Sequence, residues 1–298
     1  VAAIGDTLFW FKEYDSSLVT VCTAFINNPK VWSEETDIVS TEMPSLATIY
    51  NWNSTFFAAG KEGSIMTSTD GINWTATATT AQFTSILGVQ FAAKNYKEHL
   101  HAIVKDNDVY RFAKTFNGIN WEIGEICPDG FPIRNFSQPV SDKAKPQSGN
   151  VTSRLYIVGG ETADGEMTSS TWSCDGFFFF FFQQGCLPAM TRPAIIQYTL
   201  DTNAPKSLWI LWPGKYANGS VKNEVYFSEN KGVTWKLFKS EFSKYSDTQK
   251  IMPVGHVSGI LNQNNYWMYF FGGVDSEGKQ QANIFGGQLM TLVFDKIK

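Results

Sequence analysis

The chain has 298 residues, of which 43% are hydrophobic and 15% aromatic, so it can bury a large core. Its 24 Lys and Arg residues against 28 Asp and Glu residues give a net charge of −4, and no basic stripe is present, which argues against a nucleic-acid partner. No apolar run reaches the roughly eighteen residues that a transmembrane helix needs.

Strand-like segments follow one another along the whole chain. The first part predicts strands at residues 7–14, 18–25 and 31–35. Each unit is predicted to have four strands, and the second is apolar and ends in small residues, as at 56–60, 155–160, 208–214 and 267–273. A further strand follows at 107–110, 223–226 and 283–285, and the last predicted strand covers 291–297. This pattern predicts an all-β chain.

A short tight-turn motif ends each unit. The best copy is Ser-x-Asp-Gly-x-x-Trp at residues 68–74, and variants end at Trp121, Phe179 and Trp235, with degenerate copies ending at Trp32 and Phe294. Successive closing residues lie 42 to 59 residues apart. A repeat of about fifty residues is typical of β-propeller blades. The sequence therefore predicts a six-bladed β-propeller of four-stranded antiparallel blades.

The predicted propeller occupies residues 1–298 as a single domain. The expected blades are approximately 1–36, 37–80, 81–128, 129–188, 189–246 and 247–298. In each turn, Asp or Asn is expected to accept hydrogen bonds from backbone N–H groups, and Gly supplies a positive φ. The aromatic ring that follows is expected to cover one face of a sheet. The turn residues are therefore expected to build the fold, and no catalytic residue is assigned.

Cysteine and histidine residues suggest structural roles. We expect Cys22, Cys127, Cys174 and Cys186 to be buried free thiols, because their spacing does not match a metal site. His99 and His101 alternate on a strand, which could align metal ligands, but the pattern also fits residues that fill a sheet face. No metal or cofactor is predicted. The phenylalanine run at 177–182 is expected to be buried between blades.

These motifs resemble two known repeat types. The Ser-x-Asp-Gly-x-x-Trp turns resemble the Asp-box (BNR-like) repeats of sialidase-like propellers, and the strands at 155–160 and 267–273, which end in Gly-Gly, resemble kelch repeats. The mixture resembles a family of secreted or lipid-anchored propeller proteins of gut Bacteroidetes. This resemblance implies an extracytoplasmic location, in the periplasm or on the outer-membrane surface.

Sialidase activity is disfavoured by the arginine content. Sialidases use three arginines to hold a carboxylate, whereas this chain has only Arg111, Arg134, Arg154 and Arg192, and two of these fall on or beside predicted strands. The Phe/Tyr-Arg-Ile-Pro signature of that family is also missing from the sequence.

Uneven loop lengths point to a ligand-binding face. The connections at 161–170, 215–223 and 274–282 are longer than those of the second and third blades, and a long linker covers 128–150. Loops on a rigid scaffold commonly carry recognition groups. The candidate ligand-binding residues on these segments are Glu161, Asp164, Glu166, Lys215, Tyr216, Asn218, Asp275, Glu277 and Arg134.

Two functions remain open at this point. The first is a non-catalytic recognition module, expected to be a monomer, that binds a glycan or protein ligand through this face; few arginines favour a neutral sugar or peptide. The alternative is a glycan-active hydrolase or lyase that uses two suitably spaced carboxylates on the rim.

Overall fold

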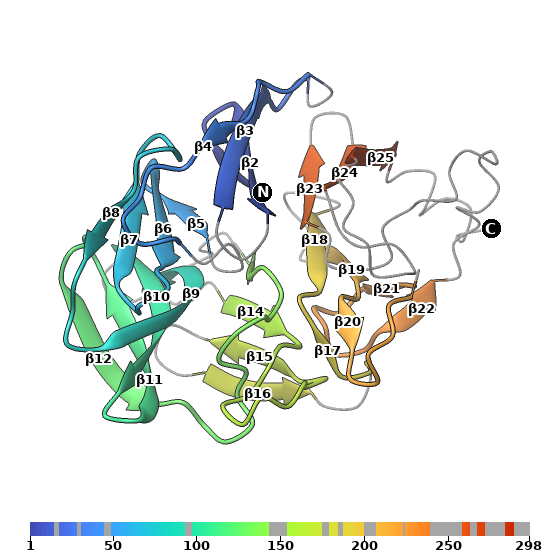
Figure 1. The fold of residues 1–298 in the computed structure, drawn as a ribbon. Helices are drawn as coiled ribbons and strands as arrows, with labels where there is room; N and C mark the ends of the chain where they lie inside the picture. Colours follow the sequence, from blue (N-terminus) through green and yellow to red (C-terminus); the bar gives the residue numbers. More distant parts are fainter. Residues whose placement is uncertain are drawn as a thin grey trace. The chain divides into compact units, whose positions relative to one another are not determined.

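The computed structural model describes residues 1–14, 18–28, 31–44, 49–92, 97–142, 154–174, 179–183, 187–199, 207–222, 224–238, 258–262, 267–271 and 284–288. These residues form strands, turns and short loops (Figure 1). Within these ranges no helix has the length and apolar character needed to cross a membrane.

Three four-stranded antiparallel sheets follow one another in the first part of the chain. The first contains β1 (Ala2–Ile4), β2 (Thr7–Tyr14), β3 (Leu18–Phe25) and β4 (Thr36–Asp37). The second contains β5 (Tyr50–Trp52), β6 (Thr55–Ala59), β7 (Ile65–Ser68) and β8 (Thr75–Thr77). The third contains β9 (Gln82–Ala92), β10 (Lys97–Asp106), β11 (Val109–Thr115) and β12 (Trp121–Ile126).

The second part of the chain continues the pattern. One four-stranded sheet contains β13 (Val140–Asp142), β14 (Arg154–Val158), β15 (Thr171–Cys174) and β16 (Phe179–Gln183). The next contains β18 (Ala194–Thr199), β19 (Ser207–Trp212), β21 (Val225–Ser228) and β22 (Lys236–Phe238). Two short strands, β17 (Met190–Thr191) and β20 (Lys215–Tyr216), pair separately. The last described sheet has three strands, β23 (Ser258–Asn262), β24 (Trp267–Phe271) and β25 (Ile284–Gln288). The number of six blades therefore stays a prediction.

The chain divides into two compact units. The first contains Val1–Arg134, Ser141–Leu155 and Cys174–Phe178, and the second contains Asn135–Val140, Tyr156–Ser173 and Phe179–Lys298. This division does not test the prediction of a single domain or the predicted blade boundaries.

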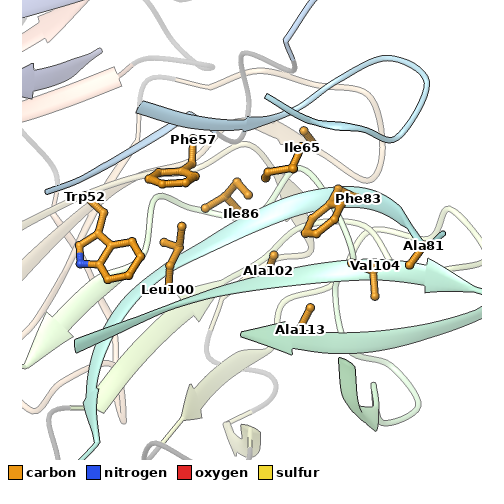
Figure 2. Close-up of a cluster of buried hydrophobic side chains, with 11 residues drawn as sticks. Trp52, Phe57, Ile65, Ala81, Phe83, Ile86, Leu100, Ala102, Val104 and Ala113 are labelled. Carbon is orange, nitrogen blue, oxygen red and sulfur yellow. The ribbon is translucent and has the colours of Figure 1, made fainter. Parts of the chain in front are cut away.

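The core of the first unit is made by side chains that alternate along facing strands. Leu100, Ala102 and Val104 of β10 belong to one buried apolar cluster, and Figure 2 shows Leu100 beside Trp52 and Phe57 from the preceding sheet. Apolar and polar residues do not alternate along β6, because both faces of this strand are buried at Phe56, Phe57, Ala58 and Ala59. A four-stranded sheet that is covered on both faces explains such continuous apolar runs.

The core of the second unit is centred on aromatic residues. Trp209 of β19 is fully buried, and its ring meets Tyr156 edge-on at 4.9 Å between centroids. Trp235 is the last residue of one of the turn motifs, and its ring centroid lies 6.4 Å from that of Trp209. These rings join residues from β14, β19 and the turn before β22 into one apolar cluster.

The turn at Asp70 shows the predicted hydrogen-bond pattern. Asp70 Oδ1 accepts the backbone N–H groups of Ile72 at 2.9 Å and Asn73 at 2.8 Å, and the Gly71 N–H donates to Ser68 Oγ. Burial raises the pKa of Asp70, but the donors of Asn73, Ile72 and Ser68 outweigh it and lower that pKa to about 2. Gly71 has φ +75°, and the Trp74 indole donates to its carbonyl. The turn is a structural element, as predicted.

Two further turns repeat this geometry with asparagine. Asn117 Oδ1 accepts the N–H groups of Ile119 and Asn120, and Asn230 Oδ1 accepts that of Thr234. The turn at Asn230 has one residue more than the other two turns. This residue, Lys231, fits because it adopts φ +59° before Gly232. Trp74 and Trp235 are buried as expected, whereas Trp121 is only half-buried against its core.

Some sequence expectations need correction. Residues 31–35 form no strand: Ser33 donates one backbone hydrogen bond to the Thr23 carbonyl and Trp32 packs edge-on against Trp10, but the strand that pairs with β3 is β4. Cys22 and Cys174 are buried, but Cys127 is only half-buried. Cys186, Phe294, the strand expected at 291–297 and the side chains of the phenylalanine run lie outside the described residues.

Candidate functional site

A linker between two sheets organises the candidate site in the second unit. This linker, residues 187–192, passes close to the glycines that follow β14 and β19. A Cβ atom on Gly159 would lie 2.9 Å from the Met190 carbonyl oxygen, and one on Gly214 would lie 1.7 Å from that of Thr191. The small residues that end these strands in the sequence are therefore required by the close approach of the linker backbone.

The linker is hydrogen-bonded on both sides. Towards β14, the Gly160 N–H donates to the Met190 carbonyl at 2.8 Å, and the Met190 N–H donates to the Thr168 carbonyl at 3.2 Å. Towards β19, β17 pairs with β20, so that Met190 lies opposite Tyr216 and Thr191 opposite Lys215. Figure 1 shows these two short strands beside each other. The linker thus joins two of the loops that the sequence singles out.

The first of these loops contains three predicted ligand residues. Glu161 pairs with Met167 across the base of the loop, and Glu161 Oε1 accepts a hydrogen bond from Thr191 Oγ1 at 3.1 Å. At the tip, the Thr162 N–H donates to the Glu166 carbonyl at 2.9 Å, which closes a tight turn. Asp164 and Glu166 are exposed, whereas Glu161 is half-buried against the linker.

The second loop presents a different set of groups. Lys215 and Asn218 are exposed. Asn218 Oδ1 accepts both the N–H of Ser220 at 3.0 Å and its hydroxyl at 2.6 Å, so this carbonyl is used within the turn. The Tyr216 N–H donates to the Ser220 carbonyl, which fixes the loop in a short hairpin. Lys215 is therefore held on an ordered backbone.

Tyr216, one of the predicted ligand-binding residues, is buried and holds its loop in place. Its ring is buried, and its hydroxyl donates to Glu224 Oε2 at 2.6 Å. Tyr226 donates to the same oxygen at 3.1 Å, and Lys222 Nζ lies 3.7 Å from Glu224 Oε1. Burial, followed by the bonds to Glu224 and Tyr226, raises the pKa of Tyr216 far above its ordinary range. The phenol therefore stays protonated and anchors the loop through Glu224.

The site prediction missed two residues, Arg192 at the end of this linker and Asn135, which is bonded to it. Asn135 and Arg192 both have a positive φ, 54° and 51°, which is uncommon for residues other than glycine. The Arg192 N–H donates to the Asn135 carbonyl at 2.6 Å, and its Nε donates to Asn135 Oδ1 at 3.0 Å. The sequence gives no signal for this pair, because Pro193 favours an extended residue at position 192.

Three predicted site residues remain. Arg134 is exposed, and it directly precedes Asn135 in the chain. Asp275 and Glu277 lie outside the described residues. The structure therefore unites Glu161, Lys215 and the buried Tyr216 through the linker, and it adds Thr191, Arg192 and Asn135 to them.

The buried histidines lie elsewhere, in the first unit. His99 and His101 of β10 face each other with ring centroids 4.5 Å apart, and both are almost fully buried. Burial, with smaller contributions from His99 and Lys114, holds the pKa of His101 well below 6.5. Across the described ranges, no group of three or more His, Cys, Asp or Glu side chains could hold a metal ion.

Comparison with known proteins identifies the fold. A family model described as "DUF6242 beta propeller domain" matches residues 1–297. Two solved structures with similar folds are YjhT and a triple arginine-to-alanine mutant of AofleA from Arthrobotrys oligospora. YjhT has 11% sequence identity and a TM-score of 0.58, with 95% of this chain and 92% of that chain covered. AofleA has 11% identity and a TM-score of 0.55, with 97% and 85% covered.

No curated protein matches the chain in sequence. At 11% identity the structural similarities concern the fold alone. Together with the family match, they establish an all-β propeller with antiparallel four-stranded blades.

Proposed function

We propose that this chain, which belongs to the DUF6242 β-propeller family, is a recognition module that binds a glycan or a protein. The binding surface would be formed by the 161–170 loop, the 187–192 linker and the 215–222 loop. The observation that carries this proposal is the pairing of β17 with β20, because it ties loops from two sheets to one backbone segment.

The hydrogen bonding of these loops supports recognition. A loop that is already ordered loses little conformational entropy when a ligand binds. The exposed groups include the ammonium of Lys215, the carboxylates of Asp164 and Glu166, and the Asn218 side chain. This mixture of donors and acceptors matches the hydroxyl groups of a sugar or the polar groups of a peptide.

A binding assay tests the proposal. We expect immobilised glycan and peptide arrays to capture the wild-type chain, and Lys215→Ala and Glu161→Gln each to weaken capture by about tenfold, equivalent to about 1.4 kcal/mol. Lys105→Ala, which changes a partly exposed lysine of the first unit that pairs with Asp108, is the matched control and should leave binding unchanged. Equal binding by all four proteins would refute the assignment of this surface.

The alternative, a glycan-active hydrolase or lyase, predicts release of products from a bound glycan. Two described carboxylates in or beside these loops have structural partners, since Glu161 accepts a hydrogen bond from Thr191 and Glu224 accepts hydrogen bonds from two tyrosines. We therefore expect binding without turnover, measured as unchanged reducing-sugar content. Turnover that disappears in Glu161→Gln would instead establish the enzymatic alternative.

A further inference from the structure

Arg192 is held in a conformation that most residues avoid. Its φ of 51° lies in the left-handed region, where an arginine is strained and a glycine is not. The residue that supports it, Asn135, is also left-handed at φ 54°. Strain of this kind persists where the surrounding structure and the function of the site demand it.

Asn135 fixes the direction of the guanidinium group. The backbone bond of 2.6 Å positions the Arg192 main chain, and the side-chain bond of 3.0 Å takes up the Nε–H. Arginine has five N–H donors, so the two terminal nitrogens retain four. Arg192 is exposed, and it forms no salt bridge with any other residue of the described ranges.

We infer that Arg192, positioned by Asn135, binds a carboxylate group of an acidic glycan. This inference rests on the proposed function and assigns a ligand class to the same surface. A guanidinium group binds a carboxylate through two parallel hydrogen bonds, which adds geometric specificity to the charge attraction. It also revises the expectation of a neutral ligand, which was based on the small number of arginines rather than on where one of them lies.

The surroundings of Arg192 favour a sugar over an acidic peptide. Glu161 accepts a hydrogen bond from Thr191, the neighbour of Arg192, and the same loop exposes Asp164 and Glu166. These carboxylates can accept bonds from sugar hydroxyls, but they repel a ligand that carries many negative charges. One carboxylate surrounded by hydroxyl groups therefore fits this surface best.

The test compares glycans that differ only in charge. The probes are sialyllactose and an aldouronic oligosaccharide with one glucuronate, each beside its methyl ester, measured by titration calorimetry. We expect at least one acidic glycan to bind about tenfold or more tightly than its ester. Arg192→Gln should remove this preference, whereas Arg111→Gln in the first unit should retain it.

A second variant separates binding from folding. Arg192→Gly keeps the backbone N–H and adopts φ 51° without strain, so we expect it to melt no lower than Arg192→Gln while losing the preference for the acid. Equal affinity for acid and ester, or an Arg192→Gln variant that keeps the preference, would overturn the inference. Arg192-dependent binding of poly-glutamate, with neither acidic glycan bound, would also overturn it.

The outcomes distinguish this inference from the function on which it rests. If glycans bind and Lys215→Ala weakens their binding, but Arg192→Gln does not, then the proposed recognition surface is supported and its carboxylate specificity is refuted. If no array component binds at all, both proposals fail.

Discussion

Gly214 lies where the backbone of Thr191 leaves no room for a side chain. A Cβ atom would lie 1.7 Å from the Thr191 carbonyl oxygen and 2.7 Å from that of Arg192. Because both neighbours are backbone atoms of the hydrogen-bonded linker, they cannot rotate away. A substitution at this glycine must therefore displace the linker.

We expect Gly214→Ala to lower the free energy of unfolding by about 3 kcal/mol, since overpacked sites have effects of this size. The measurement is urea denaturation. Gly124→Ala is the control, because at that exposed position a Cβ would meet only the Phe112 carbonyl oxygen at 3.6 Å and should change stability by less than about 0.5 kcal/mol. A stable Gly214→Ala protein would show that the linker does not lie where the structure has it.

His101 makes the stability of the first unit depend on pH. Burial, then the neighbouring His99 and Lys114, hold its pKa well below 6.5 in the folded chain, so below pH 6.5 the unfolded chain binds a proton that the folded chain does not. Stability should therefore fall as the pH drops below 6.5, by at most about 1.4 kcal/mol per pH unit for this group.

This dependence can be measured as the melting temperature between pH 8 and pH 5. In His101→Gln the slope below pH 6.5 should be smaller than in the wild type, whatever the stability of the variant at pH 8. Identical slopes in the two proteins would show that His101 does not control this loss of stability.

Single residues also show what the sequence can and cannot predict. The Asp70 turn was predictable because its partners lie within five residues, so turn chemistry alone determines it. The Arg192–Asn135 pair was not, because its members are 57 residues apart and meet only after folding. Tyr216 was placed in the correct loop, but its burial depends on Glu224 and Tyr226.

At the level of secondary-structure elements, long apolar strands were predicted well. Strands β2 and β3 begin and end at the predicted residues, because β-branched and aromatic runs carry a strong local signal. Strands β17 and β20 have two residues each and no periodicity, so they depend entirely on the contact between linker and loop. The elements that assemble the candidate site are therefore the ones that a local pattern cannot reveal.

The glycines at strand ends show a related limit. The sequence showed small residues after several strands and assigned them to a repeat type. The structure supplies the physical cause at Gly60, Gly159 and Gly214, where a side chain would collide with Glu42, Met190 and Thr191, respectively. The repeat label itself stays a prediction.

For the whole molecule, cooperativity tests the single-domain prediction. A propeller in which every blade packs against its neighbours should unfold in one transition, whereas the two compact units could unfold separately. We expect differential scanning calorimetry to give a single peak whose calorimetric and van't Hoff enthalpies agree. Two resolved peaks would favour two independently folding units.

The double-sided bonding of the 187–192 linker has a consequence for biosynthesis. Its partners lie both upstream, at Gly160 and Thr168, and downstream, at Lys215 to Ala217. A nascent chain still attached to the ribosome cannot complete these bonds until residue 217 has left the exit tunnel. The surface proposed to bind a ligand is therefore completed only after this point, and a polypeptide released earlier would lack it.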